Sequence, residues 1–177
     1  GSKSAIRKSG VAIVGARRAQ RSLEWVESLA QFCALNDIPV ISGGALGVDS
    51  AAHEGALEGR GMTTAYLGVA VDRLYPSQNR GLFGRIIENG GAIASEHPPG
   101  AITPKYEHAH RNRLITMQAQ AVVVAEAGPK SGTLGTVRWA ARLGLPVWCP
   151  PESLGGERAG IEPLLSSGKV RTLNDLN

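Results

Sequence analysis

The sequence alternates short apolar runs with longer stretches in which apolar residues recur at helical spacing. A short run without polar alternation is typical of a strand buried on both faces of a parallel sheet. Such runs predict strands at residues 11–14, 39–41, 63–67, 92–94, 121–124 and 146–148. The stretches between them predict helices at 22–35, 49–57, 80–89, 110–117 and 134–143, and the tail adds a short helix at 161–167 and a final strand at 170–171.

This order of strands and helices predicts an α/β fold. Right-handed crossovers make consecutive strands parallel and place helices on both faces, so we expect a Rossmann-like, doubly wound, mainly parallel sheet. The length of 177 residues suits a single domain. Residues 1–2, Gly-Ser, have the composition of an expression-tag remnant, and we assign the domain to residues 3–177.

Composition and cysteine usage are those of an ordinary globular chain. Hydrophobic residues make up 42% and charged residues 19%. The chain shows no apolar run long enough to cross a bilayer and no signal peptide, so we expect a cytoplasmic protein with no membrane partner. Cys33 and Cys149 lack metal-ligand spacing and are expected as buried thiols, with a disulfide between them as the alternative. The histidines show no zinc-site spacing, so neither a metal nor a cofactor is predicted.

Positive charge changes this picture modestly. The chain has 19 Lys+Arg against 15 Asp+Glu, a formal net charge of +4. This excess suits a polyanionic partner, and a solvated basic surface is the alternative. The basic residues form two clusters, Arg7, Lys8, Arg17, Arg18 and Arg21 near the first strand, and Lys105, Arg111 and Arg113 further on.

Three loops follow predicted strands at the edge where an open parallel sheet binds ligands. Their glycines can expose a row of backbone N–H donors, and their hydroxyls lie at helix starts, so together they predict a phosphate-bearing ligand. The alternatives for each loop alone are a tight turn or a helix cap. No dinucleotide fingerprint or Walker sequence is present. The candidate binding residues are Gly15 and Arg17 in the first loop (15–18), Ser42, Gly43, Gly44, Ala45 and Gly47 in the second (42–53), and Ser131, Gly132 and Thr133 in the third (131–136).

Further polar residues are expected to support these loops. Asp49 can cap the helix after the second loop, and His53, four residues later, can hydrogen-bond to it. Arginines two apart on a helix point in different directions, so one of Arg111 and Arg113 faces the ligand while the other packs or pairs elsewhere. The acidic residues Glu96 and Glu126, which follow strands, are expected to hold such arginines by charge-assisted bonds.

Taken in order, these segments resemble the Rossmann core of the DprA/Smf family of DNA-processing proteins. The resemblance covers nearly the whole chain. It implies a cytoplasmic bacterial protein that binds single-stranded DNA, helps to load the RecA recombinase during transformation and forms a homodimer through this domain. The matching segments are residues 11–17, 42–53, 74–76 with Asn79, Ser95-Glu96, 111–113, Glu126, 131–133 with Thr136, and 164–168.

The resemblance also implies roles for individual residues. Arg17 would contact phosphate, residues 42–47 would cradle the DNA backbone, and Ser131, Gly132 and Thr133 would close the pocket. Arg111, Asn112 and Arg113 would line or support it. Ala109-His110 stand where the family has an aromatic-proline pair, and the helical and winged-helix domains of many members fall outside this sequence.

Two other functions compete with DNA binding. LOG-type phosphoribohydrolases of the same superfamily carry a Pro-Gly-Gly-x-Gly-Thr-x-x-Glu pattern whose glutamate acts at the ribose. Aligning Gly132-Thr133 with the Gly-Thr puts Thr136 in the glutamate position, and aligning Gly135-Thr136 puts Trp139 there. Neither residue can perform acid–base catalysis, so we expect no enzyme activity. The remaining alternative is a sensor module that binds a mononucleotide.

Overall fold

The fold is one parallel sheet of seven strands in the order β4-β3-β2-β1-β5-β6-β7. The computed structural model describes residues 1–104 and 106–174, so Lys105 of the second basic cluster lies outside the described residues. Each observed strand pairing is parallel, which confirms the predicted doubly wound α/β class. The strands are β1 (Gly10–Val14), β2 (Val40–Ser42), β3 (Thr63–Tyr66), β4 (Ala92–Ala94), β5 (Ala119–Val124), β6 (Val147–Cys149) and β7 (Arg171–Thr172).

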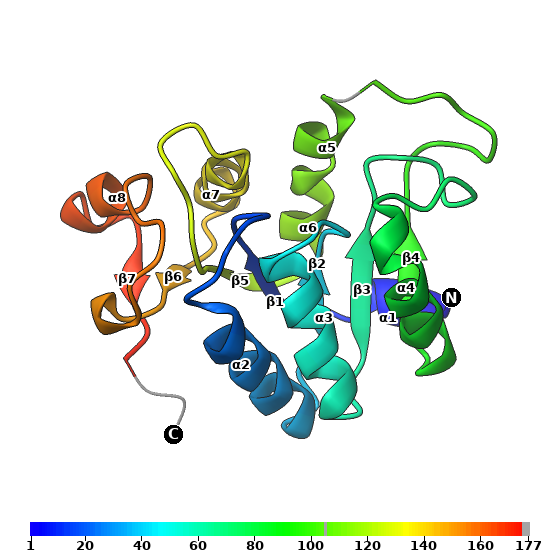
Figure 1. The fold of residues 1–177 in the computed structure, drawn as a ribbon, viewed down its shortest axis with the longest axis horizontal. Helices are drawn as coiled ribbons and strands as arrows, with labels where there is room; N and C mark the ends of the chain where they lie inside the picture. The colour runs from blue at the N-terminus through cyan, green and yellow to red at the C-terminus, as the bar shows by residue number, and fades with distance from the viewer. Residues whose placement is uncertain (105, 175–177) are drawn as a thin grey trace.

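Helices cover both faces of this sheet (Figure 1). On one face, α2, α3 and α4 pack apolar side chains against the strands, and on the other face α6 and α7 do so. The α-helices are α1 (Lys3–Arg7), α2 (Leu23–Leu35), α3 (Val48–Glu58), α4 (Arg80–Glu88), α5 (Glu107–His110), α6 (Asn112–Gln118), α7 (Thr133–Arg142) and α8 (Glu162–Ser166). Two short 3-10 helices, η1 (Ser77–Asn79) and η2 (Glu152–Leu154), lie in the connections. Within the described part of the chain, no helix has the length and apolarity needed to span a membrane.

The strand order has a switch point between β1 and β5. The chain proceeds from β1 outward to β4, then returns to pair β5 with the other side of β1, with Val11 beside Ala121 and Val14 beside Val124. At such a point the loops that follow the two central strands diverge and leave a crevice beyond their carboxyl ends. The first and third candidate loops are therefore brought to the same place.

Most expected elements are present with bounds that differ by one or two residues, and the larger differences concern the helix expected at 110–117 and the start of the chain. The expected helix at 110–117 is divided at Arg111 into α5 and α6. The N-terminal helix α1 was not expected; Ser2 is its N-cap residue, and the Ser2 side chain accepts a hydrogen bond from the Ser4 N–H at 3.2 Å. The final strand begins one residue later than expected, at Arg171. Both cysteines are buried and free, so the thiol expectation is confirmed and the disulfide alternative is wrong.

Candidate phosphate-binding site

A cavity of about 340 Å³ lies at the switch point and brings the three candidate loops together. It opens beyond the carboxyl ends of β1 and β5, where helix N-termini point toward the ligand position. We call it the switch-point cavity. Its predicted lining residues are Gly15, Arg17, Ala45, Asp49, Arg111, Asn112, Ser131, Gly132, Thr133 and Thr136, and Val14, Ala16, His108, Ala109 and Ile115 complete it.

The first two loops pack against each other through glycines. A Cβ atom on Gly15 would lie 2.6 Å from Cγ2 of Val48, so only glycine lets α3 approach the end of β1 this closely. Gly47 has a φ of +76° and faces the Ala16 carbonyl oxygen, which a Cβ at Gly47 would approach to 2.5 Å. The same Ala16 oxygen accepts a hydrogen bond from the Val48 N–H at 3.3 Å. This packing leaves Arg17 exposed at the rim of the cavity.

Arg111 is the buried cation of the site. Its guanidinium donates a hydrogen bond to the Tyr66 carbonyl at the end of β3, while its Nε atom is buried without a partner among the described residues. A Cβ atom on Gly43 would collide with both the Arg111 guanidinium and the Asp49 carboxylate, so both groups pack against the side of Gly43 from which a side chain would project. Burial lowers the pKa of Arg111, and the Asp49 charge opposes that shift. Arg111 is therefore a charge held at the cavity wall with donor capacity to spare.

Asp49 and His53 support the second loop, but they do not bond to each other as expected. Asp49 lies one residue inside α3, and its Oδ2 accepts a hydrogen bond from the Ala45 N–H at 3.2 Å. Burial raises the pKa of Asp49, and the Arg111 charge opposes this shift. His53 is fully buried and reaches away from Asp49, with Nε2 2.7 Å from the Gly43 carbonyl oxygen and Nδ1 2.7 Å from the Thr63 hydroxyl. Helical spacing was misleading here because β3 and the loop carbonyl offer His53 closer partners.

The His53 contacts fix its tautomer. A carbonyl oxygen only accepts, so Nε2 carries the proton and donates to Gly43. In the neutral ring Nδ1 is then an acceptor, and it shares the single proton of the Thr63 hydroxyl with the Val40 carbonyl oxygen, at 2.7 and 2.9 Å. Burial lowers the pKa of His53 to about 4. Behind the loop, the Ser42 hydroxyl is buried and donates to the Ile13 carbonyl at 2.6 Å. The Ser42 side chain thus ties β2 to β1 and does not reach the cavity lining.

The third loop closes the cavity from the β5 side. Ser131 Oγ accepts a hydrogen bond from the Thr133 N–H at 3.2 Å, which forms a turn directly before α7, whose N-cap residue is Gly132. The Thr133 hydroxyl donates to the Gly15 carbonyl at 3.1 Å and so joins the third loop to the first. Asn112 donates to the Gly132 carbonyl at 3.2 Å. Thr136, one turn into α7, places a buried hydroxyl at the cavity that has no hydrogen-bond partner among the described residues.

The two acidic residues differ in their roles. Glu96 accepts two hydrogen bonds from Arg113, at 2.6 and 2.5 Å, as expected. This pairing holds Arg113 outside the lining of the switch-point cavity, whereas Arg111 faces it. Glu126 binds no arginine among the described residues; it accepts from the Ser22 N–H and hydroxyl at 3.0 and 2.7 Å and from the Glu157 N–H at 3.1 Å. Burial raises the pKa of Glu126, but these hydrogen bonds outweigh burial and lower it overall.

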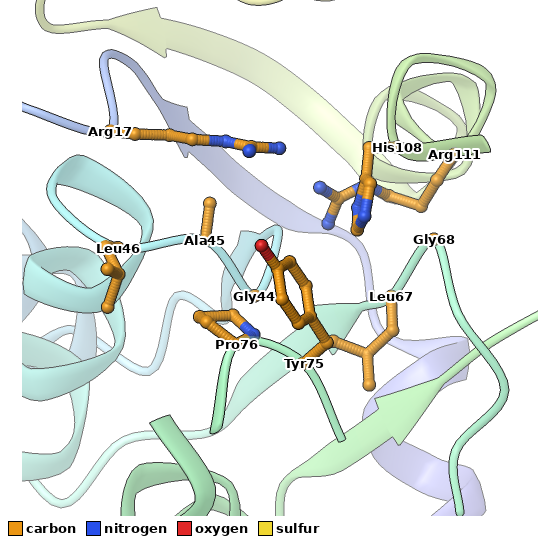
Figure 2. Close-up of a pocket in the computed structure, with 10 residues that line it drawn as sticks. All are labelled: Arg17, Gly44, Ala45, Leu46, Leu67, Gly68, Tyr75, Pro76, His108 and Arg111. Atoms are coloured by element: carbon orange, nitrogen blue, oxygen red, sulfur yellow. The ribbon is translucent and has the colours of Figure 1, made fainter. Parts of the chain in front are cut away.

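Some residues of the site gave no clear signal in the sequence. Asn79 fixes the second loop through hydrogen bonds from its amide to the Gly44 and Ala45 carbonyls, at 2.9 and 3.2 Å. A smaller hollow adjoins the switch-point cavity and is bordered by Tyr75 and His108 (Figure 2). Asn79 and Tyr75 occur in segments that carry the family resemblance, and that was the only signal for them.

Fold and site together define a class, namely a doubly wound parallel α/β domain whose switch-point cavity is lined by two arginines, glycine loops and a helix N-terminus. Within this class the chain belongs to the DNA recombination-mediator protein A family, whose model matches residues 1–175.

Individual relatives agree with this membership. A putative DNA processing protein DprA of Mycobacterium tuberculosis is 40% identical over 159 residues, which are 89% of this chain and 41% of the relative. DNA processing protein A of Helicobacter pylori, solved to describe its mode of single-stranded DNA binding, superposes with a TM-score of 0.89 at 30% identity and covers 99% of this chain and 80% of its own. The X-ray structure of DprA from Streptococcus pneumoniae superposes with a TM-score of 0.84 at 33% identity, and the match covers 96% of this chain and 60% of that one. The chain thus spans less than half of the Mycobacterium relative.

Proposed function

We propose that this domain binds single-stranded DNA through its phosphates at the switch-point cavity. The observation that carries the proposal is the convergence of Arg17, at the rim, and Arg111, in the wall, on a cavity bordered by glycine loops and a helix N-terminus. Two cations and backbone N–H donors suit the repeated anionic charge of a DNA backbone. The single-stranded DNA binding of the Helicobacter pylori relative supports the same assignment.

The proposed role is binding without catalysis. Asp49 is the one carboxylate among the described lining residues, and it is buried, accepts the Ala45 N–H and lies beside Arg111. Thr136 and Trp139 stand where a LOG-type hydrolase would need its glutamate. By family resemblance, the DNA-binding domain would act in DNA processing in the cytoplasm, as a homodimer, and would assist RecA loading during transformation.

The test is a fluorescence anisotropy titration of a labelled oligothymidylate over a series of salt concentrations. We expect affinity to fall steeply with salt because phosphate contacts release counterions. Arg17→Ala should weaken binding about tenfold and reduce the salt slope by about one, since one phosphate contact is lost. The matched control is Arg85→Ala, which removes the same charge from an exposed arginine that pairs with Glu54 on the α3–α4 surface.

Two results would reject the proposal. Wild-type protein that fails to retain the oligonucleotide at low salt excludes DNA binding by this domain. Equal losses in Arg17→Ala and Arg85→Ala would assign the binding to net charge and not to the cavity. A mononucleotide that raises the melting temperature more than the oligonucleotide does would favour the sensor function.

A further inference from the structure

The switch-point cavity is lined by two buried donors that the domain itself leaves unused. Three buried side-chain polar atoms have no hydrogen-bond partner among the described residues, and two of them, Arg111 Nε and Thr136 Oγ1, belong to side chains of this lining. Arg111 is 6% exposed and Thr136 is 1% exposed. Folded proteins give roughly 90% of their buried polar groups a partner, because an unsatisfied buried group costs free energy. Two such groups at one cavity indicate a partner that arrives with the ligand.

The free hydroxyl of Thr136 is unusual for a threonine inside a helix. Such a residue usually donates to the carbonyl three or four residues earlier. Thr116, equally buried on α6, does so, and its hydroxyl donates to the Arg113 carbonyl at 2.8 Å. For Thr136 the carbonyl four residues earlier is that of Gly132, and this oxygen accepts the Asn112 amide at 3.2 Å instead. The Asn112 contact therefore leaves the Thr136 proton available to a ligand.

The hydroxyls that the sequence predicted as ligand groups are engaged within the domain. Thr133 donates its proton to the Gly15 carbonyl at 3.1 Å, and Ser131 Oγ accepts the Thr133 N–H at 3.2 Å. These bonds hold the first and third loops in place and use the Thr133 donor fully. Of the threonines in the described lining, Thr136 is the one whose proton has no acceptor.

We infer that Thr136 is a binding residue for the DNA strand, and that its hydroxyl donates to a non-bridging oxygen of the phosphate that Arg17 and Arg111 hold. This inference rests on the proposed function. The phosphate oxygens are charged and are the strongest acceptors of a DNA backbone. A hydroxyl carries no charge, so it fixes the position of the phosphate without adding to the salt-dependent attraction.

The competing role for Thr136 is a structural one, in which its side chain only fills space beside the cavity. Two substitutions separate these roles. Valine keeps the branched shape and removes the donor, whereas serine keeps the donor and removes a methyl group. If Thr136 binds the strand, affinity follows the donor and stability follows the shape. If Thr136 is structural, affinity and stability both follow the shape.

The experiment measures the affinity for a labelled oligothymidylate by fluorescence anisotropy, and the melting temperature without DNA. We expect Thr136→Val to bind about tenfold more weakly, because a hydrogen bond to a charged acceptor is lost. The same variant should melt at or above the wild-type temperature, because a methyl group replaces a buried hydroxyl that has no partner. Thr136→Ser should bind as the wild type does and melt at a lower temperature, because a buried methyl group is removed. Neither variant should change the salt slope.

The matched control is Thr116→Val, which removes a hydroxyl of the same burial that is already bonded within its helix. It should lower the melting temperature by about 2–4 °C and leave DNA affinity unchanged. A second ligand is a strand of the same length that carries abasic tetrahydrofuran residues throughout. Thr136→Val should lose the same tenfold on this strand, because the contact is to the backbone.

Three results would overturn the role of Thr136 while leaving DNA binding intact. They are an unchanged affinity in Thr136→Val, an equal loss of affinity in Thr136→Ser, and a loss in Thr136→Val that is confined to the strand with bases. A wild-type protein that binds neither strand would instead refute the proposed function.

Discussion

Acid sensitivity at His53 is the prediction that the structure specifies most closely. The imidazole is fully buried and neutral, with a pKa of about 4 against 6.5 for an exposed histidine. Between pH 6.5 and 4, His53 therefore binds a proton in the unfolded chain but not in the folded one, and stability is lost as the pH falls from 6.5 toward 4. Linkage over that interval gives a loss of about 2 kcal/mol at about pH 5 relative to neutral pH, or roughly 4–8 °C in melting temperature.

The assay is urea denaturation followed by circular dichroism at neutral pH and at about pH 5, for the wild type and for His53→Gln. Glutamine cannot titrate, and its amide can still donate toward the Gly43 carbonyl, which accepts from His53 at 2.7 Å. The variant should be less stable than the wild type at neutral pH because the bond to Thr63 is altered. Its stability should, however, change about 2 kcal/mol less between the two pH values.

The control is His110→Gln, because the His110 side chain is 67% exposed. It should retain the wild-type pH dependence. If His53→Gln and the wild type lose the same free energy of unfolding on acidification, the neutral buried imidazole is not the source of acid sensitivity. The reasoning from its two hydrogen bonds would then be wrong.

Two further predictions concern packing and binding. Gly55→Ala should destabilise the protein by about 1–3 kcal/mol in urea denaturation, because its Cβ would collide with the Glu27 carbonyl of α2; Gly84→Ala, on α4 with nothing within 4 Å of its Cβ, should instead stabilise by about 0.5–1 kcal/mol. If both substitutions change the stability in the same direction, close α2–α3 packing is not the cause of the effect of Gly55→Ala. Burial and the site arginines lower the pKa of His108, and a bound phosphate would raise it again. Anisotropy titrations should therefore show oligonucleotide binding that tightens in the wild type as the pH falls below neutral, and His108→Phe should lack that gain.

The fold could be predicted because a strand that is buried on both faces of the sheet has an uninterrupted run of apolar residues, which is visible in the sequence. The run at 121–124 is apolar throughout because β5 lies at the centre of the sheet, and the same holds for β1. The helix α1 left no such trace. It has five residues and is held by distant contacts, such as the hydrogen bond from the Gln118 amide to the Ala5 carbonyl at 2.6 Å. Contacts of this kind depend on the assembled fold.

The site was predictable to the level of loops but not of all side chains. Parallel topology places the three loops at one edge, whatever their detailed conformation. Sequence spacing indicated that Arg111 and Arg113 diverge, yet the break between α5 and α6 and the pairing of Arg113 with Glu96 decide which one faces the cavity. Tyr75 lies in an irregular connection and His108 in the four-residue helix α5, which is too short to show a periodic pattern, so their contact could be found only from the three-dimensional structure.

The pairing of β1 with β5 has a consequence for the protein during its synthesis. The first two loops leave the ribosome early, but the third loop and Arg111 follow only after most of the domain has been made. Since β5 must insert beside β1, the central contact of the sheet closes a very long segment and forms late in folding. A nascent chain that lacks β5 and α7 therefore carries an incomplete switch-point cavity, and the cavity is complete only after β5 has paired with β1.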